Sequence, residues 1–177
     1  MILGEQVRLR SVESTDLPLL VSWMNDPEVT AGLMLWLPLS TREEESWYEN
    51  MLRRPPEERA LAIEANIEGQ WRHIGNCGFH AIDWRVRACT VGIVIGEKQF
   101  WNQGYGTKAM QLLLKHGFET LNMTRIALDV YDNNPRAIRS YEKCGFVLEG
   151  RKRQAMYKNG EYLDVLIMSV LRHEWKR

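Results

Sequence analysis

The order of strand-like and helix-like segments is the feature that most constrains the fold of this chain. Three strand-like runs, at 60–67, 73–84 and 88–96, follow one another with only short polar turns between them, which predicts an antiparallel meander. The pattern then changes: residues 104–121 carry apolar side chains at helical spacing, and residues 125–131 form an apolar strand-like run. This order predicts a mixed α/β architecture.

Capping residues mark two further helices. Ser40 and Glu43 have the spacing of a capping box, so a helix is predicted from there to about residue 54. Asn134 before Pro135 combines a preferred N-cap with a preferred first helical residue, and Gly145 suits the left-handed position after the helix end. These signals predict a helix over 135–144.

Both ends of the chain are expected to add elements. Residues 7–10 alternate and predict a strand, and a helix is expected from Ser14 to about Asn25, where Pro27 would stop it. Asn159 and Gly160 form a strong hairpin-turn signal near the C-terminus. Strands are predicted there at 146–148, 156–158 and 162–171.

Composition is that of one globular domain spanning residues 1–177. About 45% of residues are hydrophobic, and no apolar run approaches the roughly 18 residues of a membrane span. The first ten residues lack the apolar core of a signal peptide, which predicts a cytoplasmic protein. Because 23 Lys and Arg balance 23 Asp and Glu, neither nucleic acid nor an anionic membrane is expected as a main partner.

Cysteine and histidine give no sign of a metal centre. Cys77, Cys89 and Cys144 are odd in number and lack CxxC spacing, so neither a disulfide framework nor a zinc site is predicted. The four histidines show no HExxH motif and no i,i+4 pairing. A protein without a bound metal is the expectation.

The loop before residue 104 is the first candidate for ligand binding. A strand ends at Ile95, and Gly104 and Gly106 then open a helix. Glycines let the backbone approach a ligand closely, and the unpaired N–H groups of a helix N-terminus favour a phosphate. The segment matches neither the dinucleotide GxGxxG nor the GxxxxGK[ST] loop. A tight turn and a pyrophosphate cradle are both open at this point.

The helix after Asn134 is the second candidate. The N-cap role alone accounts for Asn134, and Tyr141 shares helical spacing with Ala137, Ile138 and Cys144, which is typical of a core aromatic. A tyrosine on a buried face must still place its hydroxyl group in a polar environment. Structural and catalytic roles for Tyr141 are therefore both open.

Together, these two elements resemble the GNAT superfamily of acetyl-coenzyme-A-dependent N-acetyltransferases. The resemblance rests on the Gly104–Gly106 loop and its helix, followed about 30 residues later by Asn134, Tyr141 and Gly145. Segments 7–10, 25–29 and 160–164 look like the branch that includes ribosomal-protein N-terminal acetyltransferases and bacterial spermidine acetyltransferases. The implied fold is α/β (α+β), a single GNAT-like domain whose mixed, mostly antiparallel sheet has helices on both faces.

The resemblance implies a binding site for acetyl-coenzyme A (acetyl-CoA). Tyr141 would be catalytic and protonate the departing thiolate, and backbone N–H groups near Gly92 and Val94 would polarise the thioester carbonyl. Asn134 would contact the cofactor, and the loop backbone would hold its pyrophosphate. The expected cofactor-binding residues are Ile93, Val94, Ile95, Trp101, Asn102, Gln103, Gly104, Tyr105, Gly106, Thr107, Asn134 and Lys143.

Two positions depart from the superfamily pattern. Trp101 stands where Gln or Arg usually begins the loop, and Gln103 lies too late to substitute; since such a cradle works mainly through backbone amides, cofactor binding is expected to survive. Thr90 stands where many members carry a glutamate base. Asp164 and Glu64, on predicted strands, are the base candidates, although salt-bridged or solvated carboxylates are common at such positions.

The net charge of zero conceals a gradient, from −5 in residues 1–60 through +1 in 61–120 to +4 in 121–177. Under the resemblance, basic residues fall beside the coenzyme site and acidic residues fall in N-terminal helices that would border a cationic amine. Chance distribution and helix N-terminal charge preferences also explain the pattern. The basic residues are Lys108, Arg136, Arg139 and Lys143; the acidic residues are Asp26, Glu28, Glu43, Glu44, Glu45 and Glu49.

Three functions follow from the sequence. The leading hypothesis is an enzyme that acetylates a protein or peptide N-terminal amine by direct attack in a ternary complex, not through Cys144. The alternatives are an N-acetyltransferase for spermidine, spermine or an aminoglycoside, and a catalytically silent acyl-CoA-binding module. Tyr141 favours an enzyme. A homodimer is compatible with such a fold, although no residue demands one.

Overall fold

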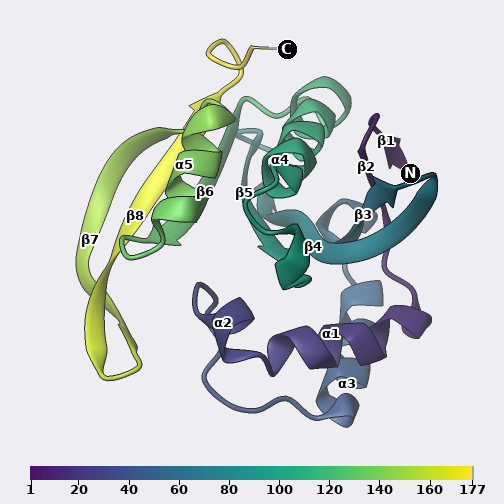
Figure 1. The fold of residues 1–177 in the computed structure, drawn as a ribbon. Helices are drawn as coiled ribbons and strands as arrows, with labels where there is room; N and C mark the ends of the chain where they lie inside the picture. The colour runs from purple at the N-terminus through teal and green to yellow at the C-terminus, as the bar shows by residue number, and fades with distance from the viewer. Residues whose placement is uncertain (177) are drawn as a thin grey trace.

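The computed structural model describes residues 1–176, which form one eight-stranded sheet in the order β1-β2-β3-β4-β5-β6-β8-β7 (Figure 1). Neighbouring strands are antiparallel except β5 and β6, which are parallel. The predicted mixed, mostly antiparallel sheet is therefore confirmed. The strands are β1 (Ile2–Leu3), β2 (Val7–Ser11), β3 (Leu61–Ile67), β4 (Gln70–Asp83), β5 (Ala88–Ile95), β6 (Arg125–Tyr131), β7 (Val147–Lys158) and β8 (Glu161–Leu171).

The predicted meander is formed by β3, β4 and β5. A two-residue turn joins β3 to β4, and both of its residues have positive φ, 51° at Glu68 and 84° at Gly69. Positive φ at both central residues is the backbone requirement of a type I′ hairpin turn, which matches the right-handed twist of the strands. The β4–β5 ladder is irregular between His80 and Asp83.

Five α-helices pack against the sheet within residues 1–176. Local signals explain their ends: the Ser40 side chain accepts a hydrogen bond from the Glu43 amide at 3.2 Å, Asn134 caps the last helix, and Gly145 has φ 91°. No helix within residues 1–176 is long and apolar enough to span a membrane. The helices are α1 (Leu17–Met24), α2 (Pro27–Thr30), α3 (Thr41–Leu52), α4 (Tyr105–Lys115, continued by a π-helical turn) and α5 (Pro135–Lys143).

Two parts of the fold differ from the sequence prediction. Pro27 ends the first helix as expected but also begins α2, because Asp26 caps that turn by accepting from the Glu28 amide at 2.9 Å. The predicted strands 146–148 and 156–158 are the two ends of one strand, β7. Its middle is exposed and charged, which removes the apolar signal, and its register shifts between Leu148 and Gly150 and again between Lys152 and Met156.

Helices cover both faces of the sheet, as predicted. Along β3, Ile63 and Ala65 belong to the buried cluster that packs under α4, whereas Ala62 points the other way, into a smaller cluster with α1 and α3 side chains. In Figure 1, α4 and α5 lie over the sheet, and α1, α2 and α3 gather at one end of the molecule.

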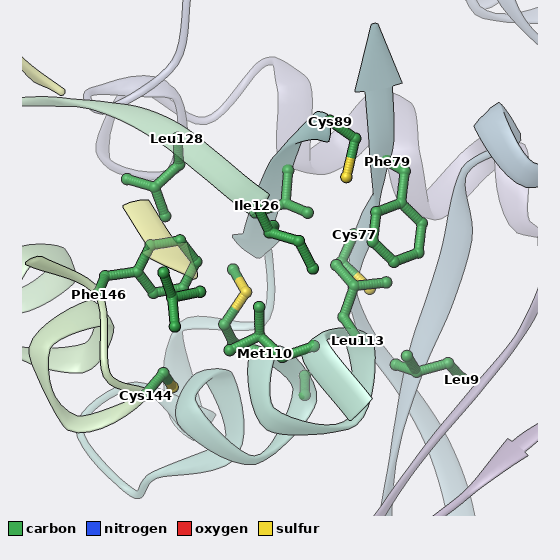
Figure 2. Close-up of a cluster of buried hydrophobic side chains, with 14 of the residues drawn as sticks. Leu9, Cys77, Phe79, Cys89, Met110, Leu113, Ile126, Leu128, Cys144 and Phe146 are labelled. Atoms are coloured by element: carbon green, nitrogen blue, oxygen red, sulfur yellow. The ribbon is translucent and has the colours of Figure 1, made fainter. Parts of the chain in front are cut away.

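The main core lies between the sheet and the helices α4 and α5. Figure 2 shows Met110 and Leu113 of α4 meeting Phe79, Ile126 and other side chains of the strands. The three cysteines, Cys77, Cys89 and Cys144, are free and buried in this core, and burial raises the pKa of each thiol to about 12. They pack as small apolar groups.

Candidate functional site

The strands β5 and β6 pair over three residues only and then separate. Their parallel ladder runs from Ala88 opposite Arg125 to Thr90 opposite Ala127. Beyond these pairs, a cavity of about 420 Å³ is lined by the end of β5, by the end of β6, by the N-terminal part of α4, by α5 along its length, and by residues between 28 and 33. The divergence of two neighbouring strands therefore creates the site.

The N-terminus of α4 presents free amide groups to this cavity. Gly104 has φ 84°, and the first hydrogen bond of the helix runs from the Lys108 amide to the Gly104 carbonyl, at 3.0 Å. The amides of Tyr105, Gly106 and Thr107 precede that bond and line the cavity wall. Such amides, together with the helix dipole, suit the phosphate oxygens of a pyrophosphate.

Trp101 fixes the loop that leads into α4. Its indole Nε1 donates to the Ile95 carbonyl at 2.8 Å, and the Arg136 guanidinium of α5 lies 3.8 Å from the centroid of a Trp101 ring. Burial lowers the pKa of Arg136 from its ordinary value. Trp101 therefore anchors the loop and holds a cation beside the cavity. The sequence placed Arg136 near the coenzyme site but gave no sign of this stacking contact.

Asn134 connects α5 to the opposite wall of the cavity. Its Oδ1 accepts from the Ala137 amide at 3.2 Å, which is the predicted N-cap bond. Its Nδ2 faces Gly32, where a Cβ atom would come within 2.8 Å of that nitrogen. The sequence gave no signal for this contact, because the two residues are about 100 positions apart.

Two contacts hold α4 and α5 together beside the cavity. The hydroxyl groups of Thr107 and Ser140 are 2.8 Å apart, and the Cys144 thiol donates to the Thr107 carbonyl at 3.6 Å. The N-terminus of α4 is thus fixed to the C-terminal half of α5. Arg136, Arg139 and Lys143 add positive charge along the α5 side of the cavity.

Tyr141 lies on the α5 side of the cavity. Its ring packs against Phe146, with 5.8 Å between centroids, and contacts the main core. Burial, followed by the nearby Cys144, raises the pKa of its hydroxyl group to about 12. Among the described residues, no protein group is hydrogen-bonded to this hydroxyl. Tyr141 can therefore hold a proton at neutral pH and donate it to a group in the cavity that develops negative charge in direct contact with the hydroxyl.

The structure brings together nearly all of the predicted site residues. Gln103 is the exception: it is exposed, and its side chain donates to the Gln99 carbonyl. Lys108, expected beside the coenzyme site, instead contacts Gln6 and lines a separate cavity of about 620 Å³. The predicted residues that line the site are Ile93, Val94, Ile95, Trp101, Asn102, Gly104, Tyr105, Gly106, Thr107, Asn134, Tyr141 and Lys143.

Neither predicted base lies in the cavity. Arg8 and Arg10 donate to the Glu64 carboxylate at 2.5 and 2.8 Å, on the face of the sheet that α1 covers. The Asp164 carboxylate accepts from Arg151 at 2.6 Å and from the Gln154 amide at 2.8 Å. Both carboxylates have structural partners, so the salt-bridged interpretation accounts for them.

Two other carboxylates, Glu28 and Asp129, line the cavity, and each has a lysine partner. The Lys98 ammonium lies 3.0 Å from Glu28 and 2.8 Å from Asp26, and the Lys152 ammonium lies 2.8 Å from Asp129. All of these pairs are partly exposed, and exposed ion pairs contribute little net stability because solvent screens them. An entering cation can therefore compete with the lysines. Of the predicted acidic residues, only Glu28 reaches the cavity.

Trp23 supports the start of the loop between β5 and α4, a contact that the sequence did not reveal. Its ring lies directly on Gly96, where a Cβ atom would approach a ring carbon to 2.0 Å, and its Nε1 donates to Glu97 at 3.0 Å. Gly96 is needed because the indole occupies the space of a side chain. Within residues 1–176, no cluster of three or more His, Cys, Asp and Glu side chains could hold a metal ion.

Comparisons with known proteins agree with this geometry. The family profile of the acetyltransferase (GNAT) domain matches residues 6–147. A putative ribosomal N-acetyltransferase of Bacillus subtilis is 27% identical over 98% of this chain and 95% of its own length. A spermidine N(1)-acetyltransferase of Vibrio cholerae is also 27% identical, over 98% of this chain and 97% of its own.

The fold also matches solved structures. The crystal structure of a spermidine N-acetyltransferase from Vibrio cholerae, in complex with CoA and spermine, superposes with a TM-score of 0.86. The two chains are 27% identical, and the match covers 97% of this chain and 98% of that one.

Proposed function

This chain belongs to the GNAT family of acetyl-CoA-dependent N-acetyltransferases, and we propose from that premise that its acceptor is a primary amine of a polyamine such as spermidine or spermine. The observation that carries the proposal is the match, over nearly the whole of both chains, to a spermidine N-acetyltransferase in complex with CoA and spermine. The carboxylates at the cavity edge, Glu28 and Asp129, suit a cationic acceptor.

The predicted peptide N-terminal amine becomes the second candidate. It is supported by the similarity to a putative ribosomal N-acetyltransferase. That relative and the spermidine enzyme share the same percentage of identical residues with this chain, 27%. The structural comparison favours the polyamine, which the sequence gave as the alternative.

The cavity fits acetyl-CoA in three respects. The free amides of Tyr105, Gly106 and Thr107 can bind its pyrophosphate, and Arg136 can neutralise phosphate charge. The side of β5 that has separated from β6 leaves backbone groups without a strand partner, in reach of the thioester carbonyl. The cofactor supplies an activated acetyl group, and the protein positions it for attack.

Tyr141 supplies the proton that the departing thiolate needs. A thiol has a pKa near 8.5, so its thiolate is a weaker base than the Tyr141 phenolate, and the transfer depends on close contact with the sulfur as charge develops. A polyamine ammonium group has a pKa near that of lysine, about 10.4, so it must lose a proton before attack. Among the described residues, both carboxylates that line the cavity, Glu28 and Asp129, are paired with lysines, and we propose that water accepts the proton.

The acetyl group passes directly from the thioester to the amine in this scheme. Cys144 is unsuited to carry it, because the thiol is buried, lies outside the cavity lining and has a pKa raised to about 12. The thiolate required for a covalent intermediate would be scarce at neutral pH.

Thiol release from acetyl-CoA in the presence of different amines tests this function. We expect turnover with spermidine and spermine, and weaker turnover with peptides or aminoglycosides at equal concentration. Preference for peptides would replace the polyamine proposal with the second candidate. Tight CoA binding without turnover on any amine would leave only the silent binding module. Cytoplasmic location and a homodimer stay predictions from the sequence.

A further inference from the structure

Lys158, near the tip of the β7–β8 hairpin, is a buried lysine outside the chemistry described above. Its residue surface is 7% exposed, although its neighbours Tyr157 and Asn159 are exposed. The ammonium group donates to the carbonyls of Thr30 and Leu33, each at 2.5 Å. Lysine is rarely buried without a partner, and here the partners are main-chain carbonyls instead of a carboxylate.

The carbonyls that Lys158 binds belong to a segment that forms one wall of the cavity. Thr30 is the last residue of α2, and Val29, Ala31, Gly32 and Leu33 line the cavity. Figure 1 places α2 beside the tip of the β7–β8 hairpin. The hairpin therefore holds this wall, residues 29–33, from the outside.

A second contact extends the attachment. The Trp36 indole Nε1 donates to the Tyr157 carbonyl at 3.2 Å, on the strand residue next to Lys158. On the inner side, Gly32 lies directly against the Asn134 side chain. The wall is thus held between the hairpin and the N-cap of α5, so a shift of the wall changes the space in front of the cofactor groups.

We propose that Lys158 is a positioning residue that fixes the acceptor-side wall of the cavity through the carbonyls of Thr30 and Leu33. The inference rests on the proposed function, because it assigns residues 29–33 to the acceptor, opposite the cofactor groups of β5, α4 and α5. Burial lowers the pKa of Lys158, in agreement with an ammonium group surrounded by protein. Because Lys158 binds main-chain carbonyls, its hydrogen bonds fix the backbone conformation of the segment independently of the side chains that the segment carries.

Lys158→Met tests this role, since methionine keeps the unbranched stem and removes the donors. We expect the KM for spermidine to rise about tenfold because both hydrogen bonds to the wall are lost, while kcat and the KM for acetyl-CoA change less than about twofold. Lys158→Arg, which keeps the donors, should restore much of the lost affinity. Arg153→Met, an exposed basic residue on the same strand, is the matched control and should behave like the original protein.

Hydrogen exchange provides a readout that does not depend on activity. In Lys158→Met, amides of residues 30–36 should exchange faster, while those of α4 and α5 keep their protection. A folded variant with unchanged exchange at 30–36 and unchanged acceptor KM would overturn the proposal, as would equal losses for both substrates. If the original protein acetylates no polyamine, the proposed function fails, and the exchange result alone decides whether Lys158 holds the wall.

Discussion

Tyr141 combines a place in the cavity with a hydroxyl group that no described side chain or backbone group binds. Tyr141→Phe removes the proposed proton donor and leaves the ring that packs on Phe146. We therefore expect KM values for both substrates to stay near the original and kcat to fall about 10²–10⁴-fold, the usual contribution of general acid catalysis. Steady-state kinetics of thiol release measure this. Full activity of Tyr141→Phe with the best acceptor would exclude the assigned role.

The pH dependence of the rate tests the same residue from another direction. Because burial raises the pKa of Tyr141 to about 12, its proton is retained throughout the neutral range and up to about pH 10. The acceptor amine, in contrast, becomes neutral as pH rises. The original enzyme should therefore show kcat/KM for spermidine rising from about pH 6 to 9, without a falling limb below about pH 10. A falling limb near neutral pH would point to a different acid.

At the level of secondary structure elements, the start of α4 can be tested through its two glycines. Gly106→Ala places a Cβ atom 3.5 Å from Ile95, an ordinary contact, and removes a glycine from a helix, so stability should be unchanged or about 1 kcal/mol higher. If the pyrophosphate of CoA lies against Gly106, the same methyl group will raise the Kd for CoA about tenfold. Chemical unfolding and calorimetric titration measure the two effects.

Gly104→Ala is the matched comparison for Gly106→Ala. An alanine Cβ would meet no atom within 4 Å there, but φ is 84°, and left-handed backbone costs an L-residue about 1–2 kcal/mol. Gly104→Ala should therefore lose stability. Unchanged CoA affinity in a stable Gly106→Ala variant would contradict close approach of the cofactor to this turn.

On the scale of the whole molecule, a charged network joins β2 to β3 and to the segment before α1. Arg8 and Arg10 bind Glu64, and Arg10 also binds Asp16 at 2.7 Å. Burial alone would raise the pKa of Glu64, but the hydrogen bonds from Arg10 and Arg8 outweigh it and the pKa is lowered. The carboxylate therefore stabilises the fold above its ordinary pKa, and this contribution is lost as pH falls through the lowered value.

Glu64→Gln should accordingly reduce the free energy of unfolding by about 2 kcal/mol at pH 7, through loss of charge-assisted hydrogen bonds. The difference between the variant and the original protein should shrink below about pH 4, where the carboxyl of the unfolded chain is protonated. Urea unfolding at several pH values measures it, with the exposed Glu49→Gln as control. A difference that is constant with pH would show that the charge of Glu64 contributes nothing.

The sequence predicted best what local chemistry determines. Ser40, Asn134 and the Asn159–Gly160 turn act through neighbours a few residues away, and their elements formed as expected. Contacts between distant segments left no local signal: Lys158 binds Thr30 from 128 residues away, and Arg136 stacks on Trp101 across two elements. The residues around the cavity could be named from the family resemblance, but its walls depend on tertiary packing.

The position of β8 in the sheet has a consequence for biosynthesis. It is the last strand along residues 1–176, at Glu161–Leu171, yet it lies inside the sheet, paired on one side with β6 and on the other with β7. A ribosome-bound chain that has exposed every residue of the cavity lining, through Lys143, still has β6 as an unpaired edge. The site can therefore be completed only after β8 has also left the ribosomal tunnel and paired with β6.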